Sequence, residues 1–190
     1  MKIFSVSLGR NGTQSLSKHL KDHGFTVTHF YKFDAIKLGD FEENSDGILE
    51  HFNSIPDTDA HVDIPTCLIF DKMYDKFPDA KFINITRTPE SWVSSMLKMK
   101  NMMGHSGDPY AFEEAYCKFY INTEKTKIQD LTEEDLLLIR EKHLQRVSDF
   151  FYGKENYLEV NLLDPEISEK IKLFLGLDKD VSFPNEDGFR

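Results

Sequence analysis

The residues with the clearest chemical potential lie near the start of the chain, between an apolar run and a run typical of a helix. The segment Gly9-Arg10-Asn11-Gly12-Thr13-Gln14-Ser15 follows the mostly apolar residues 3–6. Its glycines allow a tight loop whose N–H groups point inward, and a helix that begins near Thr13 adds the partial positive charge of its N-terminus. We therefore predict a cradle for phosphate or sulfate oxygens, formed by Gly9, Arg10, Asn11, Gly12, Thr13, Gln14 and Ser15.

This loop resembles a P-loop but differs from it at one decisive position. The nucleoside triphosphatase pattern G-x-x-x-x-G-K-[ST] places a lysine after the second glycine, where it reaches the β- and γ-phosphates of the nucleotide. In this chain Thr13 stands at that position, and the basic residue lies between the glycines as Arg10. The loop therefore keeps the chemistry of anion binding but lacks the lysine that a kinase needs.

A second group of anion-binding side chains follows the apolar run 81–86. Arg87 ends this predicted strand, and Ser91 and Ser95 are four residues apart on the helix expected after it, so their hydroxyls share one face. A guanidinium fork with nearby hydroxyls suits a phosphate group. Because ligands of open α/β sheets lie at the carboxyl ends of the strands, we expect Arg87 to bind a ligand.

The elements that must position these residues alternate along the chain. Short apolar runs indicate strands, and patterns with helical spacing, start signals and stop signals lie between them. This alternation predicts an α/β fold of the three-layer P-loop type, with a central parallel sheet flanked by helices. We expect strands at 2–7, 25–30, 60–64, 81–86 and 157–162, helices at 13–23, 41–54, 68–77, 89–103, 110–125, 132–152 and 165–175, and a loop at 102–109.

Length and charge limit the kind of protein this is. The chain of 190 residues fits a single domain over 1–190. Its net charge of −10 argues against broad nucleic-acid binding, which needs a basic surface. We find no apolar stretch of roughly 18 residues that would span a membrane, and the chain begins with a predicted strand instead of a signal peptide. We therefore expect a cytoplasmic protein.

The two anion-binding groups together resemble those of the P-loop sulfotransferases. These enzymes transfer a sulfuryl group from 3′-phosphoadenosine-5′-phosphosulfate (PAPS) to an acceptor. Their loop P-K/R-S-G-T-T is similar to residues 9–14, and their arginine with a serine eight residues later matches Arg87 and Ser95. The resemblance implies that Arg10 holds the bridging and sulfuryl oxygens of PAPS and that Arg87 and Ser95 hold its 3′-phosphate. It also implies an acceptor that is a small molecule or a glycan, and a reaction that requires no metal.

The same resemblance points to a group that removes the proton of the acceptor. The segment His61-Val62-Asp63-Ile64-Pro65 is similar to the family's K-T-H-L-P, so Asp63 stands where the family has its catalytic histidine and His61 where it has a lysine. Asp63 is one candidate base, and the alternative is that it caps the following helix or binds the loop. His29, at the end of the second predicted strand, is the rival base, since an imidazole titrates near neutral pH; alternatively it is structural.

Two other functions stay open at this point. The strand–loop–helix order also fits a small-molecule or nucleotide kinase, against which the missing lysine counts. The residues Asn11, Gln14 and Ser15 differ from the sulfotransferase pattern, which allows a catalytically silent nucleotide-binding module. We expect the acceptor pocket in the irregular segments 30–60 and 100–130. The sequence names neither the acceptor nor the oligomeric state.

Overall fold

The computed structural model describes residues 1–29, 58–103, 116–121 and 130–184. The chain divides into two compact units. The first contains residues 1–31, 54–87 and 151–190, and the second contains residues 32–53 and 88–150. The predicted phosphate loop (residues 9–15), His29, Asp63 and Arg87 all belong to the first unit, whereas Ser95 belongs to the second. The single domain expected over 1–190 stays a prediction.

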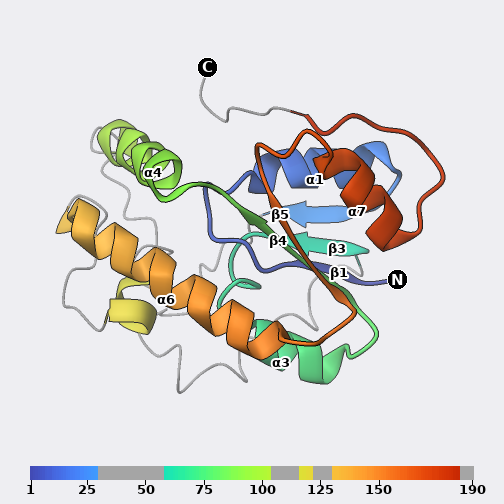
Figure 1. Ribbon diagram of the computed structural model, residues 1–190, viewed down its shortest axis with the longest axis horizontal. Helices are drawn as coiled ribbons and strands as arrows, with labels where there is room; N and C mark the ends of the chain where they lie inside the picture. The colour runs from blue at the N-terminus through green and yellow to red at the C-terminus, as the bar shows by residue number, and fades with distance from the viewer. Residues whose placement is uncertain (30–57, 104–115, 122–129, 185–190) are drawn as a thin grey trace. The chain divides into compact units, whose positions relative to one another are not determined.

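The first unit is built on a parallel sheet, as the alternation of elements predicted. Five strands lie in the order β2-β3-β1-β4-β5, and every neighbouring pair is parallel. All the strands therefore end at the same edge of the sheet (Figure 1), where the candidate residues lie in the loop after β1, at the last residue of β2 and directly after β3 and β4. The strands are β1 (Ile3–Ser5), β2 (Val27–His29), β3 (Ala60–Val62), β4 (Lys81–Thr86) and β5 (Tyr157–Asn161).

The helices fall where their start and stop signals indicated, with shifts of one or two residues at most ends. The left-handed Gly176 ends the last helix, as expected, and the hydroxyl of Thr88 accepts a hydrogen bond from the N–H of Ser91 (3.3 Å) at the start of the helix after β4. The helices are α1 (Thr13–Asp22), α3 (Phe70–Lys76), α4 (Pro89–Met103), α6 (Glu133–Phe151) and α7 (Ile167–Leu175).

Some expected elements are shorter than the sequence suggested, and others lie outside the described residues. The strand expected at 2–7 ends at Ser5, because the chain leaves the sheet to form the phosphate loop. Of the helix expected at 110–125, the structure describes a π-helical turn, η2 (Cys117–Ile121). The helix at 41–54, most of the loop at 102–109 and most of both acceptor segments lie outside the described residues.

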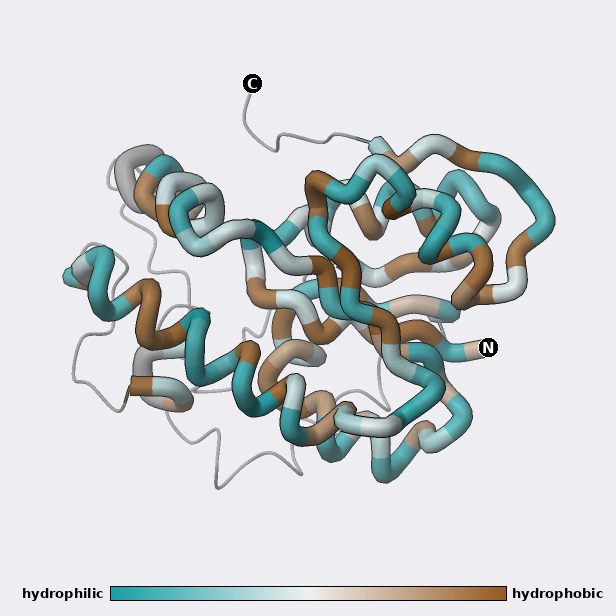
Figure 2. Tube along the Cα trace, in the orientation of Figure 1, coloured by the Kyte–Doolittle hydropathy of each residue, from teal (hydrophilic) through white to brown (hydrophobic). Residues whose placement is uncertain are grey.

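The two faces of the sheet have different cores. On one face, α1 and α7 pack against aliphatic side chains of the strands, and Ile3, Leu16, Ile83 and Ile171 are fully buried there. The other face is aromatic. The ring centroids of Phe4 and Phe82 are 5.5 Å apart there, and the ring of Tyr74 in α3 packs against Phe82. Figure 2 shows hydrophobic residues along the strands, interspersed with hydrophilic ones. The sheet is therefore held on both faces, which gives the loops at its edge a rigid support.

Within the described ranges, no helix combines the length and apolar character that crossing a membrane requires. In the same ranges, no group of three or more His, Cys, Asp and Glu side chains is arranged to hold a metal ion.

The second unit contains a polar contact deep in its core. The hydroxyl of Tyr120 in η2 lies 2.7 Å from Nδ1 of His143 in α6, and both side chains are buried. The guanidinium of Arg146 lies over the ring of Phe119 at 4.8 Å. His143 and Arg146 therefore join η2 to α6 by packing, and neither is among the residues expected to bind the nucleotide.

A buried histidine of α1 makes the stability of the first unit dependent on pH. His19 is fully buried against the rings of His23 (4.7 Å) and Phe183 (5.2 Å). Burial, followed by the nearby His23, lowers the pKa of His19 to about 4 from the usual 6.5. The folded protein therefore binds fewer protons at His19 than the unfolded chain does, so its stability falls as the pH drops from 6.5 towards 4.

We expect this histidine to account for about 2 kcal/mol of the stability lost between pH 7.5 and pH 4.5, at about 1.36 kcal/mol per pKa unit. Urea unfolding of the wild type and of His19→Leu at both pH values measures the effect. The variant should lose correspondingly less stability on acidification, because leucine fills the site without titrating. Equal losses in the two proteins would show that His19 does not titrate in this way.

Candidate functional site

The phosphate loop is fastened to β4 by residues that precede it, Val6 and Ser7. Val6 donates its N–H to the carbonyl of Ile83 (2.9 Å), and the N–H of Ile85 donates to the hydroxyl of Ser7 (2.7 Å). Ser7 is fully buried, and its side chain replaces a backbone acceptor at the point where the chain leaves the sheet. No motif in the sequence singles out Ser7, although a serine at the end of an apolar run was the available signal.

Two residues of the loop adopt a left-handed backbone. The φ angles are 69° at Arg10 and 76° at Gly12, and the N–H of Asn11 closes a turn onto the carbonyl of Leu8 (3.2 Å). We expected the glycines to supply the unusual conformations, but a left-handed residue occurs at Arg10 and not at Gly9. Among the described residues other than glycine, only Arg10 and Asp63 have a positive φ, and both border this site. Backbone strain of this kind is concentrated at functional sites.

Arg87 is in direct contact with this loop. Its Nη1 atom donates a hydrogen bond to the carbonyl oxygen of Arg10 (3.0 Å), although the two residues are 77 positions apart. The contact is possible because β1 and β4 are neighbouring parallel strands that end at the same edge. The structure therefore brings together the arginines of the two groups that the sequence predicted separately.

Gly12 lies against a residue that no sequence pattern indicated. A Cβ atom at Gly12 would stand 2.6 Å from Cδ1 of Leu162, which directly follows β5. The φ of 76° already disfavours any residue other than glycine. The close approach of the loop to Leu162 thus adds a second reason for glycine at this position.

We expect Gly12→Ala to destabilise the protein by about 1–2 kcal/mol, the cost of a left-handed backbone with a Cβ atom, increased by the displacement of Leu162. Gly24→Ala is the matched control, because Gly24 has a φ of 93° but nothing within 4 Å of its added Cβ. Chemical denaturation of both variants separates strain from contact. A smaller loss for Gly12→Ala than for Gly24→Ala would contradict the importance of the Leu162 contact.

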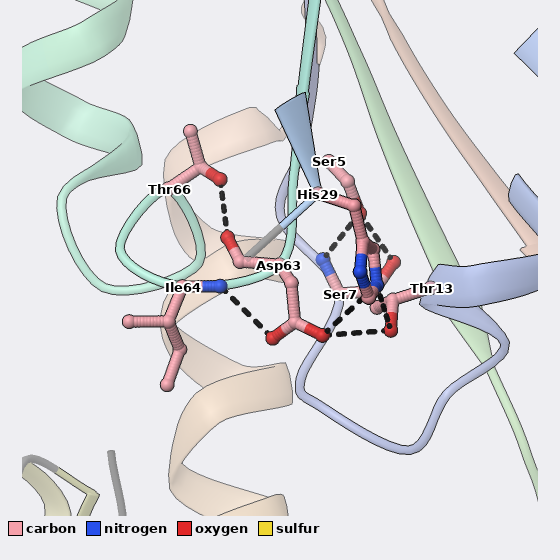
Figure 3. Close-up of polar contacts among 7 residues, drawn as sticks. All are labelled: Ser5, Ser7, Thr13, His29, Asp63, Ile64 and Thr66. Carbon is pink, nitrogen blue, oxygen red and sulfur yellow. Dashed lines mark hydrogen bonds and ion pairs between the residues drawn. The ribbon is translucent and has the colours of Figure 1, made fainter. Parts of the chain in front are cut away.

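Three polar side chains meet beside the loop, each from a different part of the sheet edge (Figure 3). The hydroxyl of Thr13, the first residue of α1, donates to Oδ2 of Asp63 at 2.7 Å. Nε2 of His29 lies 3.3 Å from Oγ1 of Thr13 and 3.6 Å from Oδ2 of Asp63. We call these residues the Thr13–Asp63–His29 cluster. It unites both candidate bases with a residue of the phosphate loop.

The backbone around Asp63 fixes its carboxylate in this position. Asp63 has a φ of 78°, its Oδ1 accepts the N–H of Ile64 (2.9 Å), and its carbonyl accepts the hydroxyl of Thr66. The interpretation of Asp63 as a helix cap is wrong, because α3 begins at Phe70 and the residue before it, Ile69, is its N-cap. The alternative that Asp63 binds the loop is what the structure shows.

The electrostatic surroundings keep the imidazole of His29 neutral at pH 7. Burial lowers its pKa below the usual 6.5, the positive charge of Lys21 lowers it further, and the carboxylate of Asp63 opposes both. The side chains of His29 and Asp63 are 24% and 13% exposed, so both are shielded but neither is sealed from solvent. His29 is therefore able to accept a proton near neutral pH.

His61 does not join this cluster. It lies next to Val62 on β3, so its side chain points to the face opposite to that of Val62 and of His29, which pairs with Val62. There its ring stacks with Phe4 at 5.7 Å, and its Nε2 lies 3.2 Å from the hydroxyl of Thr58. The structure thus places His61 in the aromatic core, away from the loop residues that His29 and Asp63 contact.

The remaining candidate residues occupy different environments. Gly9 and Ser15 are buried, and Gln14 is exposed on the first turn of α1. Asn11 is 2% exposed, and its Oδ1 atom has no hydrogen-bond partner. Ser95 is a buried residue of α4 in the second unit. The joint action of Ser95 and Arg87 therefore stays a prediction.

Comparisons with known proteins show which family and which fold this chain resembles. The family model described as a sulfotransferase domain matches residues 2–187. The Ava biosynthesis cluster protein M of Aspergillus versicolor is 29% identical over 114 residues, which are 50% of this chain and 42% of that protein. The chain therefore matches less than half of the length of that relative.

Two solved structures share the fold. A sulfotransferase from Alicyclobacillus acidocaldarius superposes with a TM-score of 0.56 at 18% identity, over 97% of this chain and 84% of the other. A mouse sulfotransferase complexed with PAP superposes with a TM-score of 0.51 at 17% identity, over 95% of this chain and 60% of the other. At these identities the likeness concerns the fold.

Proposed function

Because this chain belongs to the sulfotransferase family, we propose that it transfers the sulfuryl group of PAPS to a hydroxyl or amine group of an acceptor. The observation that carries the proposal is the contact between Arg87 and the carbonyl of Arg10, which brings the two predicted arginines together at the ends of β1 and β4. A nucleotide with anionic groups at both its 3′ and its 5′ position suits such a pair of guanidinium groups.

The residues of the loop fit the phosphosulfate end of PAPS. Gly12 gives α1 no side-chain cap, so the N-terminus of this helix is suited to accept an anion in place of a capping residue. Arg10 adds a positive charge within the same loop. The 3′-phosphate is assigned to Arg87 of the first unit. The fold neighbour from mouse, which was solved with PAP, supports this choice of nucleotide.

The transfer requires little covalent participation of the protein. The acceptor oxygen attacks the sulfur in line, the bond between sulfur and the bridging oxygen breaks, and its electron pair stays on the 5′-phosphate. Positive groups beside this oxygen stabilise the leaving phosphate. The proton of the acceptor passes to the Thr13–Asp63–His29 cluster, where Asp63 and His29 are the two candidate bases.

Isothermal calorimetry with 3′-phosphoadenosine-5′-phosphate (PAP), the nucleotide product, tests the proposal without knowledge of the acceptor. We expect saturable binding with one PAP per chain, and release of PAP from PAPS when a suitable acceptor is present. No binding at millimolar PAP would overturn the proposal. Magnesium-dependent turnover of ATP would favour a kinase, and PAP binding without transfer to a broad panel of acceptors would favour a silent binding module.

A further inference from the structure

The hydrogen bonds of the Thr13–Asp63–His29 cluster determine which nitrogen of His29 carries its proton. The hydroxyl of Thr13 has a single hydrogen, and the 2.7 Å bond to the carboxylate of Asp63 uses it. Oγ1 of Thr13 can then only accept a hydrogen bond from Nε2 of His29, 3.3 Å away. Neutral His29 must therefore be protonated at Nε2, which leaves the lone pair on Nδ1.

From this chain of hydrogen bonds we propose that Nδ1 of His29 receives the proton of the acceptor, and that Thr13 and Asp63 are positioning residues that fix the reactive tautomer. This inference rests on the proposed sulfuryl transfer and decides between its two candidate bases. Asp63 is less suited to receive this proton, because its Oδ1 already accepts the N–H of Ile64 and its Oδ2 accepts the hydroxyl of Thr13. His29 also has the more exposed side chain, at 24% against 13%.

The balance of charge during the reaction makes this assignment measurable. As the acceptor oxygen bonds to sulfur, its proton moves to Nδ1 and the bridging electron pair moves onto the 5′-phosphate. The phosphate of PAP is a free monoester, which carries about two negative charges, whereas the same phosphate in PAPS is masked by the sulfuryl group. The cationic imidazole and the newly exposed charge thus arise together and stabilise each other.

The other charged groups near His29 act in opposite directions. Among the described residues, Asp63 from the segment after β3 favours the imidazolium, and Lys21 of α1 disfavours it. Burial also disfavours the imidazolium, so the free protein holds His29 unprotonated. A dianionic 5′-phosphate beside the loop shifts this balance towards the imidazolium. PAP should therefore bind with uptake of a proton by His29.

Calorimetric titration of PAP in buffers of different ionisation enthalpy measures that proton. We expect uptake by the wild type at pH 7–8 and an affinity that weakens with rising pH, by up to about tenfold per pH unit for one linked proton. His29→Gln should show neither effect. Adenosine 3′-phosphate is the matched ligand control, because it lacks the 5′-phosphate and should bind without uptake. Equal proton uptake by the wild type and by His29→Gln would show that His29 does not take up the proton when PAP binds, and would overturn the proposal.

Nitrogen-15 NMR of the imidazole reports the tautomer in the free wild-type protein, with no ligand and no substitution. We expect the Nε2–H form above pH 7, its retention in Thr13→Ser, and its loss in Asp63→Asn, where the hydroxyl of Thr13 is released to donate to Nε2. An Nδ1–H tautomer in the wild type would overturn the assignment. Failure of PAP to bind, with the expected tautomer observed, would instead count against the proposed function.

Discussion

Arg87→Ala should weaken the binding of PAP by about 30-fold, which corresponds to about 2 kcal/mol. The variant should lose the charge-assisted contact of Arg87 with the 3′-phosphate. It also loses the 3.0 Å hydrogen bond from Arg87 to the carbonyl of Arg10. Arg10→Ala should weaken binding by a similar amount, through the loss of its charge at the 5′ end. Calorimetry measures both affinities.

Truncated nucleotides separate the two ends of this site. The effect of Arg87→Ala should become much smaller with adenosine 5′-phosphosulfate, which lacks the 3′-phosphate, and the remainder measures the support that Arg87 gives to the loop. The effect of Arg10→Ala should shrink with adenosine 3′-phosphate. Arg87→Lys is the matched control, since it keeps the charge but loses the planar fork. Unchanged PAP affinity in both alanine variants would refute the site.

His29→Gln should slow sulfuryl transfer by about 100- to 10,000-fold, the usual contribution of a positioned general base. The unprotonated imidazole is the active form, and burial lowers the pKa of His29 below 6.5. The wild-type rate should therefore fall only on the acid side of neutrality, as His29 takes up a proton. Single-turnover release of PAP from PAPS, with an acceptor found by screening, measures the rate at each pH.

Nucleotide binding at pH 8.5 provides the control for this variant. His29 is uncharged at that pH in the free protein, so His29→Gln should bind PAPS about as tightly as the wild type there. Asp63→Asn should reduce the rate less than His29→Gln does, because it disturbs the tautomer without removing the acceptor nitrogen. A fully active His29→Gln with an inactive Asp63→Asn would identify Asp63 as the base.

Much of the architecture could be predicted from local patterns. The alternation of apolar runs and helical spacing indicated the parallel sheet, and the position of Thr88 before Pro89 indicated the start of α4. These signals are local because a hydrogen-bonded cap, a turn glycine or an amphipathic face depends on residues within a few positions of one another. The ends of the short strands were less predictable. The strand expected at 2–7, for example, ends at Ser5, because the chain leaves the sheet there to form the loop.

The role of each candidate base could not be decided in this way. The motif around Asp63 suggested both Asp63 and His61, which are two residues apart and would share a face if the strand continued. β3 ends at Val62, however, and Asp63 has a left-handed backbone and binds Thr13, whereas His61 lies in the aromatic core. His29 had no motif of its own. It became a strong candidate because β2 pairs with β3, which places His29 beside Val62 and next to Asp63.

The sequence by itself indicated the glycine loop at residues 9–15, the strand that precedes it and the helix that follows it, because all three are encoded by neighbouring residues. Only the tertiary structure decided which distant residues complete that loop. Arg87 on the carbonyl of Arg10, Leu162 against Gly12, and Asp63 with His29 at Thr13 all depend on the strand order β2-β3-β1-β4-β5. Strand order arises from the packing of the whole sheet, so no local pattern contains it.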